Sequence, residues 1–372
     1  MGGRSRARWG PVAVLLAGVL AGRAAAGARV GRREAPAGGG GLVVNTWAFT
    51  NATERAYEVL AATGQAMAAL EQGLAVCEVE QCDGSVGYGG SPDERGETTL
   101  DALVMDGETM DIGAVADLRG VPNAAAAAAM VLKYSKHTIL AGQQASDFAE
   151  EMGLAKSSLE TQGSAALFKA WMGKDCQPNY RQGVYPDPET SCGPYSRLPD
   201  PGGERGPAPR LSQRYNRHVR QDNHDTIAMV IVGDDGHVVS GASTNGANHK
   251  VPGRVGDSPI PGAGSYAMNG VGGCGCTGDG DTMMRFLPCY QVVESMRLGM
   301  SAKDAAEDAV ARIRRFYPSF LGALIAVGAD GTHAGAVNCW QLTYSVRGDG
   351  MREPQTFQVD PAVPCPPEGG AP

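Results

Sequence analysis

Tight turns between pairs of apolar runs constrain this fold more than any other feature of the sequence. There are three such pairs, at 99–117, 226–243 and 320–342, and each has its own Asp-Gly turn between the two runs. Asp-Gly between two apolar runs is typical of a β-hairpin. A further apolar run at 42–47 predicts one more strand. The chain is therefore expected to build antiparallel strand pairs in both of its halves.

Segments with helical periodicity follow the predicted strands. Apolar residues recur at helical spacing in six ranges, which are 53–74, 123–133, 145–152, 164–172, 286–298 and 302–316. Helices that cover antiparallel sheets bury faces that would otherwise be exposed. Because 42% of the 372 residues are hydrophobic and they are spread evenly, one large globular unit is expected. The pattern predicts an α/β fold, arranged as a four-layer αββα sandwich.

The first 26 residues have the order of a secretory signal peptide. Arg4, Arg6 and Arg8 precede an apolar run at 11–22, and alanines end the segment at Ala26. We expect cleavage near Ala26, and an N-terminal anchor is the alternative. No later stretch reaches the roughly 18 to 20 apolar residues that a membrane helix needs. Since the net charge is −8 and no basic cluster stands out, neither a membrane nor a nucleic acid is expected as a partner.

Nine cysteines behind a predicted signal peptide indicate disulfide bonds. Their grouping suggests three local pairs, which are Cys77 with Cys82, Cys176 with Cys192, and Cys339 with Cys365. Cys274, Cys276 and Cys289 remain, and this odd remainder means at least one free thiol. A zinc site made of these three is the alternative, but no histidine cluster matches it, so no metal is expected. One glycosylation sequon begins at Asn51.

A polar tract interrupts the regular pattern in the middle of the chain. The sequence from 176 to 220 lacks periodicity and is rich in Pro, Gly and Arg, which predicts a loop or linker. It ends in His224-Asp225 and meets Thr226 at the start of an apolar run. A threonine at the start of a strand is ordinary by itself. Three small, polar, glycine-rich segments follow it, however: STNG at 243–246, GRVGDS at 253–258 and TGDGD at 277–281.

Together with His224-Asp225-Thr226, these segments resemble the glycosylasparaginases, which are asparaginase-type N-terminal nucleophile hydrolases. VNTW at 44–47 and DIGAV at 111–115 fit the same family, and the resemblance extends over 42–365. It implies the αββα fold of the N-terminal nucleophile hydrolases and self-cleavage between Asp225 and Thr226. An α chain (27–225, with a flexible linker at about 196–222) and a β chain (226–372) would then form one domain. The family also implies a heterotetramer of two α and two β chains, a lysosomal location reached through the secretory pathway, and no cofactor.

The resemblance assigns roles to residues near the predicted cut. Thr226 is the expected nucleophile, and its freed α-amine, with a reference pKa of about 8, is the expected general base. Arg254 is expected to bind the α-carboxylate of the substrate and Asp257 its α-ammonium group, because a guanidinium binds a carboxylate through two hydrogen bonds. The other expected site residues are Thr277 and Gly278 as oxyanion donors, Thr244 beside the nucleophile, Trp47 as a wall of the pocket, and Ser85 as a more remote support.

The predicted activity is hydrolysis of the bond between N-acetylglucosamine and asparagine in small glycoasparagines. Two alternatives stay open from the sequence. One is an L-asparaginase or isoaspartyl peptidase with the same machinery, and the other is a non-catalytic secreted binding protein of the same fold. The chain departs from the family pattern at 272–276, where Gly and Cys replace small alanines. It departs again at Ala306 and Ala326, near which the family implies a further cysteine pair.

Overall fold

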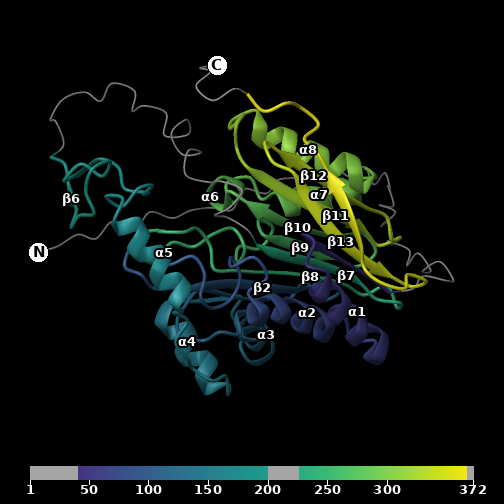
Figure 1. The fold of residues 1–372 in the computed structure, drawn as a ribbon. Coiled ribbons are helices and arrows are strands. Elements are labelled where there is room, and N and C mark those ends of the chain that lie inside the picture. The colour runs from purple at the N-terminus through teal and green to yellow at the C-terminus, as the bar shows by residue number, and fades with distance from the viewer. Residues whose placement is uncertain (1–40, 200–225, 367–372) are drawn as a thin grey trace, which may run out of the picture. The chain divides into compact units, whose positions relative to one another are not determined.

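The computed structural model describes residues 41–199 and 226–366, and both ranges belong to one compact unit. The predicted signal peptide, most of the predicted linker, and Asp225 lie outside the described residues. The described chain is a mixed α/β protein with a large central sheet (Figure 1). None of the described helices has both the length and the apolar run needed to cross a bilayer.

The central sheet has eight strands in the order β14-β13-β1-β7-β8-β2-β3-β4. These strands are β1 (Leu42–Thr46), β2 (Leu100–Asp106), β3 (Ile112–Leu118), β4 (Ile139–Ala141), β7 (Ile227–Val232), β8 (Val238–Thr244), β13 (Leu342–Gly348) and β14 (Gln355–Val359). Neighbouring strands are antiparallel except β3 and β4, which are parallel. β7 and β8 are central, and every residue in both is buried.

A second sheet has four strands in the order β12-β11-β10-β9, and all three pairings are antiparallel. Its strands are β9 (Ser265–Met268), β10 (Gly272–Gly278), β11 (Gly322–Gly328) and β12 (His333–Asn338). The two shortest strands, β5 (Val184–Tyr185) and β6 (Ser196–Arg197), pair only with each other. The beginning of the tract predicted as a linker is thus a small hairpin.

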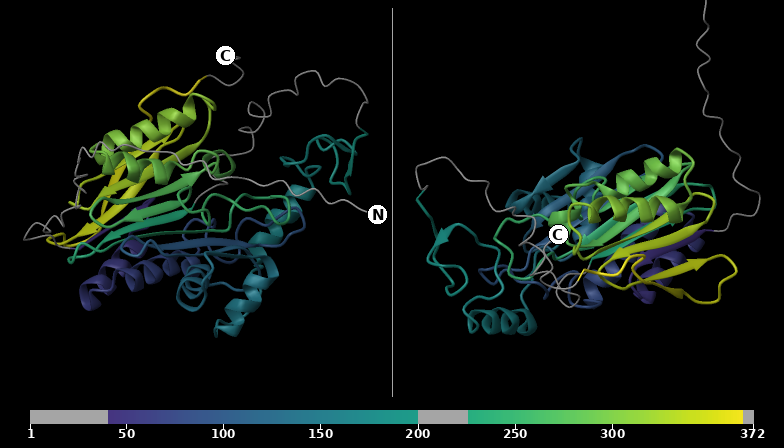
Figure 2. Two further views of the ribbon diagram at one scale, coloured as in Figure 1. Left: turned by 180° about the vertical axis from the view of Figure 1, so that it is seen from behind. Right: turned by 90° about the horizontal axis from the view of Figure 1, so that it is seen from above.

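Eight helices lie in the described ranges. They are α1 (Thr50–Thr63), α2 (Ala66–Glu80), α3 (Ala124–Tyr134), α4 (Gly142–Glu151), α5 (Gln162–Met172), α6 (Gly280–Met283), α7 (Pro288–Arg297) and α8 (Ala302–Arg314). Figures 1 and 2 show α1, α2 and α3 on one face of the central sheet and α7 and α8 on the far side of the four-stranded sheet.

β7 explains why the two sheets stack. Alternate residues of a strand point to opposite faces, and in β7 both sets are apolar. Ile227, Met229 and Ile231 pack in the same core as the α1–α3 helices. Val230 and Val232 pack in a second core with β11 of the other sheet. The opposite face of the four-stranded sheet forms a third core with α7 and α8. A strand with two apolar faces is stable only between two layers, which accounts for the unbroken apolar run.

Two expectations about the elements were wrong. The predicted helix over 53–74 is two helices, because Gly64 adopts a left-handed φ of 67° and ends α1. β10 lies in a glycine-rich stretch for which no strand was predicted. A Cβ on Gly275 would lie 2.8 Å from Ala228 Cβ, and one on Gly273 would lie 2.7 Å from Val230 Cγ1. The glycines of β10 therefore let the two sheets approach closely, which the sequence of β10 alone could not reveal.

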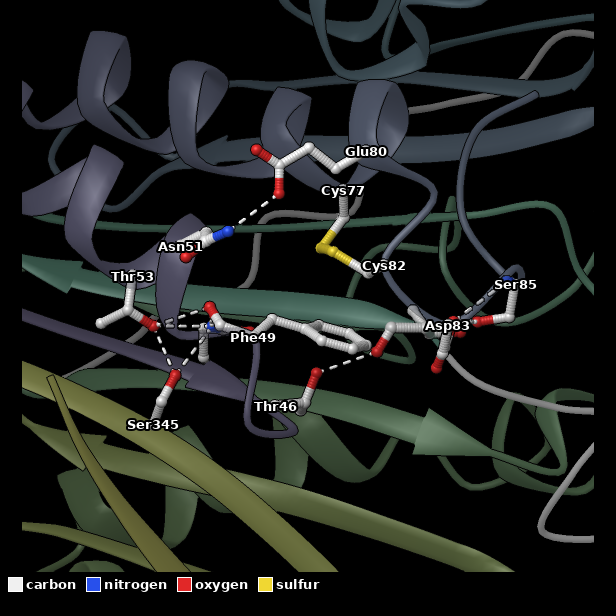
Figure 3. Close-up of a disulfide and its surroundings, with 12 residues drawn as sticks. Thr46, Phe49, Asn51, Thr53, Cys77, Glu80, Cys82, Asp83, Ser85 and Ser345 are labelled. Atoms are coloured by element: carbon white, nitrogen blue, oxygen red, sulfur yellow. Dashed lines mark hydrogen bonds between the residues drawn. A yellow bond between two sulfur atoms is a disulfide. The ribbon is translucent and has the colours of Figure 1, made fainter. Parts of the chain in front are cut away.

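The structure contains three disulfide bonds, which join the three cysteine pairs suggested by the sequence: Cys77–Cys82, Cys176–Cys192 and Cys339–Cys365. Cys77–Cys82 lies at the end of α2 (Figure 3). Asn51, the sequon residue, is exposed in the first turn of α1, and its side-chain amide donates to Glu80 Oε2 at 3.0 Å. Ala306 and Ala326 are buried in the core beneath α7 and α8.

Candidate active site

Thr226 lies directly before β7 and is 2% exposed. Its carbonyl oxygen accepts a hydrogen bond of 2.8 Å from the hydroxyl of Thr46, the last residue of β1. The same hydroxyl accepts one of 2.9 Å from the N–H of Ala228. The backbone pairing of β1 with β7 ends at Asn45. Two residues later, Trp47 has a left-handed backbone conformation with a φ of 66°. The Thr46 side chain thus joins the two strands where their backbones separate.

Thr244, the last residue of β8, lies across the ladder from Thr226. Ile227 pairs with Ser243, so one further step along each strand places these two threonines opposite each other. The Thr244 hydroxyl also accepts a hydrogen bond of 2.9 Å from the N–H of Gly246. The structure therefore brings the predicted nucleophile and its predicted neighbour together.

Ser85 contacts the loop after β8 through its backbone. Its carbonyl accepts a hydrogen bond of 2.9 Å from the N–H of Asn245, the residue after Thr244. Its hydroxyl instead donates to Asp83 Oδ1 at 2.5 Å (Figure 3). Ser85 is thus positioned as a support of the loop after β8, and its side chain is held by Asp83.

Thr277 and Gly278 end β10 in the other sheet. Gly273 faces Val230 and Gly275 faces Ala228, so the next step of two residues brings Thr277 over Thr226. Thr277 is buried, and its hydroxyl has no hydrogen-bond partner within 41–199 and 226–366. Gly278 has a φ of 123°, and a Cβ there would lie 2.6 Å from Gly322 Cα, so only glycine fits. An unused hydroxyl at this position is available to a bound molecule.

Arg254 is held by an acidic residue that the sequence analysis left without a role. Its Nε and Nη2 atoms lie 3.0 Å and 2.7 Å from Asp281 Oδ2. The Arg254 side chain is 12% exposed. Gly246 and Gly256 border its Nη1 atom, because a Cβ on either glycine would lie 3.0 Å from it. A side chain at either glycine would displace the guanidinium.

Asp257 lies beside Arg254 and is buried. A Cβ on Gly280, the first residue of α6, would lie 2.5 Å from Asp257 Oδ1 and 3.2 Å from Arg254 Nη2. Asp257 Oδ2 has no hydrogen-bond partner in the described parts of the chain. Burial raises the pKa of this carboxyl to about 7, and the nearby Arg254 charge only partly offsets this. A buried carboxyl oxygen without a partner is costly, and a positive group bound here would satisfy it.

Trp47 forms part of an aromatic pair near the end of β1. Its ring packs edge-on against Trp340 with 4.8 Å between the centroids. Its backbone N–H donates to the carbonyl of Thr343 at 2.7 Å. The indole N–H has no acceptor among the described residues. Trp47 directly follows Thr46, so this pair stands next to the residue that holds Thr226.

Lys250 is a further buried charged residue that the sequence analysis missed. Its ammonium group donates to the carbonyl oxygens of Asn245 at 2.6 Å and Thr99 at 3.3 Å. Burial lowers its pKa to about 8. Lys250 ties the loop after Thr244 to the residue before β2. The signal that could have found it is a lone lysine within a run of small and polar residues between STNG and GRVGDS.

The chain is similar to known proteins over most of its length. Residues 27–354 match the family model described as asparaginase. The chain belongs to the asparaginase family. It is 47% identical over 326 residues to the mouse N(4)-(beta-N-acetylglucosaminyl)-L-asparaginase, covering 86% of this chain and 91% of the mouse protein. The rat protein of that name is 49% identical over 299 residues, covering 80% and 84%. A probable isoaspartyl peptidase/L-asparaginase of Arabidopsis thaliana is 48% identical over 328 residues, covering 86% and 90%.

Proposed function

We propose that this member of the asparaginase family is an amidase that hydrolyses the bond between N-acetylglucosamine and asparagine in free glycoasparagines. The observation that carries the proposal is the pair of unsatisfied buried groups, the Thr277 hydroxyl on the strand that stacks on β7 and Asp257 Oδ2 beside Arg254. Buried polar groups without partners are costly unless a ligand satisfies them. The similarity to the two rodent enzymes supports the same substrate class.

The proposed reaction begins with self-cleavage. The Thr226 hydroxyl attacks the carbonyl carbon of Asp225, the peptide C–N bond breaks, and water then hydrolyses the resulting ester. This releases the Asp225 carboxylate and the α-amine of Thr226. The free amine can take the proton of its own hydroxyl, because its reference pKa of about 8 is close to neutrality. Thr226 thus supplies both nucleophile and base.

Hydrolysis of the substrate follows the same chemistry. The Thr226 oxygen attacks the side-chain amide carbon of the glycoasparagine, and the amine passes the proton to the leaving glycosylamine. Water then hydrolyses the aspartyl ester on Thr226. The Thr277 hydroxyl and the Gly278 N–H donate to the oxygen on which negative charge develops. The location of Thr277 over Thr226 supports this role.

Arg254 and Asp257 read the amino-acid end of the substrate. The guanidinium binds the α-carboxylate and the Asp257 carboxylate binds the α-ammonium group. Asp281 holds the guanidinium in place from the side. Opposed charges that lie side by side suit a zwitterion with both α groups free. Trp47 forms a wall of the pocket, Thr244 contacts the nucleophile, and Ser85 supports their loop.

A second candidate is an L-asparaginase or isoaspartyl peptidase, which the similarity to the Arabidopsis protein favours. Both activities need the same nucleophile and the same binding of the substrate's α-carboxylate and α-ammonium groups. They differ in the leaving group, which is a glycosylamine, ammonia or an amino acid. Rates on glycosylasparagine, asparagine and an isoaspartyl dipeptide, compared as kcat/KM for one preparation, decide between them. A higher value for the dipeptide would replace the first proposal by the second.

The proposal also includes the processing of the chain. Residues 1–26 are a signal peptide, 27–225 become the α chain, and 226–372 become the β chain of one αββα domain of the N-terminal nucleophile hydrolase type. The order of helix, sheet, sheet and helix layers supports this fold. Two α and two β chains form a lysosomal heterotetramer with a glycan on Asn51, whose exposure supports that site. The three disulfide bonds support passage through an oxidising compartment.

The experiment that tests the function is N-terminal sequencing and intact mass of the purified protein, combined with kinetics. We expect a fragment that begins Thr226-Ile227-Ala228. Thr226→Ala is expected to remain uncut and inactive, while Thr226→Ser, which keeps a hydroxyl, retains part of both activities. Full activity of an uncut chain would overturn the proposal, because its α-amine would be locked in a peptide bond.

A further inference from the structure

Three cysteines that take no part in the three disulfide bonds lie close together next to the proposed oxyanion donors. They are Cys274 and Cys276 on β10 and Cys289 in the first turn of α7. All three are completely buried, and their sulfur atoms lie within 4.8 Å of one another. The sulfurs of Cys276 and Cys289 are only 3.1 Å apart. Cys276 directly precedes Thr277, so this cluster adjoins the proposed oxyanion donors.

We propose that Cys276 and Cys289 form a fourth disulfide bond, which fixes the end of β10 to α7, and that Cys274 stays a thiol. This inference does not depend on the proposed function. The chain already carries three disulfide bonds, so it folds where thiols are oxidised. The pairing of Cys276 with Cys289 needs their sulfurs to approach by about 1 Å, since a disulfide bond is about 2 Å long.

A bond between Cys274 and Cys276 fits less well. Cys274 and Cys276 are two residues apart on one strand, and Cα atoms at that spacing are about 6.6 Å apart. This lies at the upper limit for a disulfide bond. Cys276 and Cys289 instead come from two elements that pack against each other. The sulfur contact of 3.1 Å thus joins the strand to the helix.

A metal ion suits this layer poorly. The three cysteines belong to the apolar core beneath α7 and α8, where Cys289 Sγ also lies 3.7 Å from the carbonyl oxygen of Gly264. Burial raises the pKa of the Cys276 and Cys289 thiols; at Cys274 burial acts in the same direction, but hydrogen bonds with Cys276 and Cys289 lower the pKa to about 6. A metal ion would need all three sulfurs deprotonated. Three thiolates around a divalent ion would also leave a negative charge in an apolar layer. A disulfide bond is neutral and leaves no charge behind.

The oxidant is a disulfide of a small thiol such as glutathione, which acts before the layer closes in folding. The Cys276 thiolate attacks that disulfide, forms a mixed disulfide and releases one glutathione thiolate. The Cys289 thiolate then attacks the Cys276 sulfur and releases the second glutathione thiolate. The two protons of the cysteines pass to the two glutathione molecules. Two electrons reduce the oxidant, and one S–S bond joins β10 to α7.

The test is alkylation of the full-length secreted protein, denatured without reductant in the presence of iodoacetamide, followed by peptide mapping. We expect one alkylated cysteine, Cys274, and a linked peptide pair that contains Cys276 and Cys289. Cys274→Ser is expected to keep the linked pair and leave no alkylated cysteine. Cys289→Ser is expected to lose the link and expose two alkylated cysteines.

Thermal unfolding gives a second readout. A cross-link around a short loop restricts the unfolded chain, so Cys289→Ser is expected to lower Tm by about 5 °C. Cys274→Ser makes the same substitution in the same layer and is the matched control, with a clearly smaller shift. Three alkylated cysteines in the wild-type protein would overturn the proposal. A stoichiometric metal ion in elemental analysis, or a link between Cys274 and Cys289, would overturn it as well.

Discussion

Replacement of Thr46 by valine tests how the proposed nucleophile is held. Valine has nearly the shape of threonine and lacks only the hydroxyl, so the packing at the end of β1 is kept. Two contacts are lost, the hydrogen bond to the Thr226 carbonyl and the one from the Ala228 N–H. Both groups lie in the buried ladder beside the candidate active site. We expect slower self-cleavage and a lower kcat, because Thr226 loses the contact that fixes its carbonyl.

The magnitude follows from the two hydrogen bonds. A buried polar group that loses its partner costs about 1 to 3 kcal/mol, so the two together cost about 2 to 6 kcal/mol of stability. Only the part of this free energy that holds the Thr226 hydroxyl in its reactive position affects the rate. If that part is about 1.4 to 2.7 kcal/mol, kcat falls by about 10- to 100-fold. KM should change little, since Thr46 does not contact Arg254 or Asp257.

The assay follows the fraction of cut chain with time after purification and then measures kcat and KM on glycosylasparagine for the cut enzyme. Thr46→Ser restores the hydroxyl and should recover most of both losses. Ser146→Ala is the matched control, because the buried Ser146 hydroxyl likewise accepts a backbone N–H, that of Arg119 at 2.8 Å. It should lower Tm and leave kcat unchanged. A Thr46→Val enzyme that cuts itself and turns over at the wild-type rate would refute the reasoning.

Three further predictions concern charges. Arg254→Lys should still cut itself but lose about 10- to 100-fold in kcat/KM, because one ammonium cannot replace a bidentate guanidinium; an unchanged kcat/KM would remove Arg254 from the substrate site. Acetylation of the substrate α-amine should cost about 2 to 5 kcal/mol in kcat/KM, since Asp257 then lacks its cation; equal values for free and acetylated glycosylasparagine would contradict this role. Burial raises the pKa of Glu78 to about 7 from 4.5, so the folded chain holds this proton more tightly than the unfolded chain. The free energy of unfolding of the wild-type protein should therefore fall by about 3 kcal/mol as pH rises from 4.5 to above 7. Urea unfolding of Glu78→Gln should not show this fall. If the free energies of both proteins change with pH in the same way, Glu78 does not titrate in this range.

The strands that sequence could predict are those whose own residues determine them. β7 and β8 have apolar runs on both sides of Asp234-Asp235-Gly236, so the hairpin is encoded locally. β10 was missed because glycine has a low strand propensity. Its glycines are explained only by Ala228 and Val230 of the other sheet, which leave no room for side chains.

The same limit applies to the candidate site. The family motifs located Thr226, Arg254 and Thr277 in the sequence, and the structure places Thr226 at the start of β7 and Thr277 near the end of β10, which stacks on β7. Thr46 could not be predicted as their support, because its two hydrogen bonds cross from β1 to β7 over 180 residues of sequence. Asp281 was visible in TGDGD, but its contact depends on how the loop that carries Arg254 folds over α6. Motifs identify groups that act on a substrate better than the groups that position them.

The charges of the proposed site couple the binding of a zwitterion to the release of a proton. Asp281 pairs with Arg254, and burial raises the pKa of Asp257 to about 7, so this carboxyl holds a proton below that pH. The α-carboxylate of a substrate would compete with Asp281 for the guanidinium, while the α-ammonium group would favour the ionised form of Asp257. Below pH 7, binding therefore expels a proton from Asp257 as it brings in the ammonium group. A ligand that carries only one of the two charges would leave either a competed ion pair or an unpaired Asp257, so the proposed roles of Arg254 and Asp257 would make the site selective for a free amino acid.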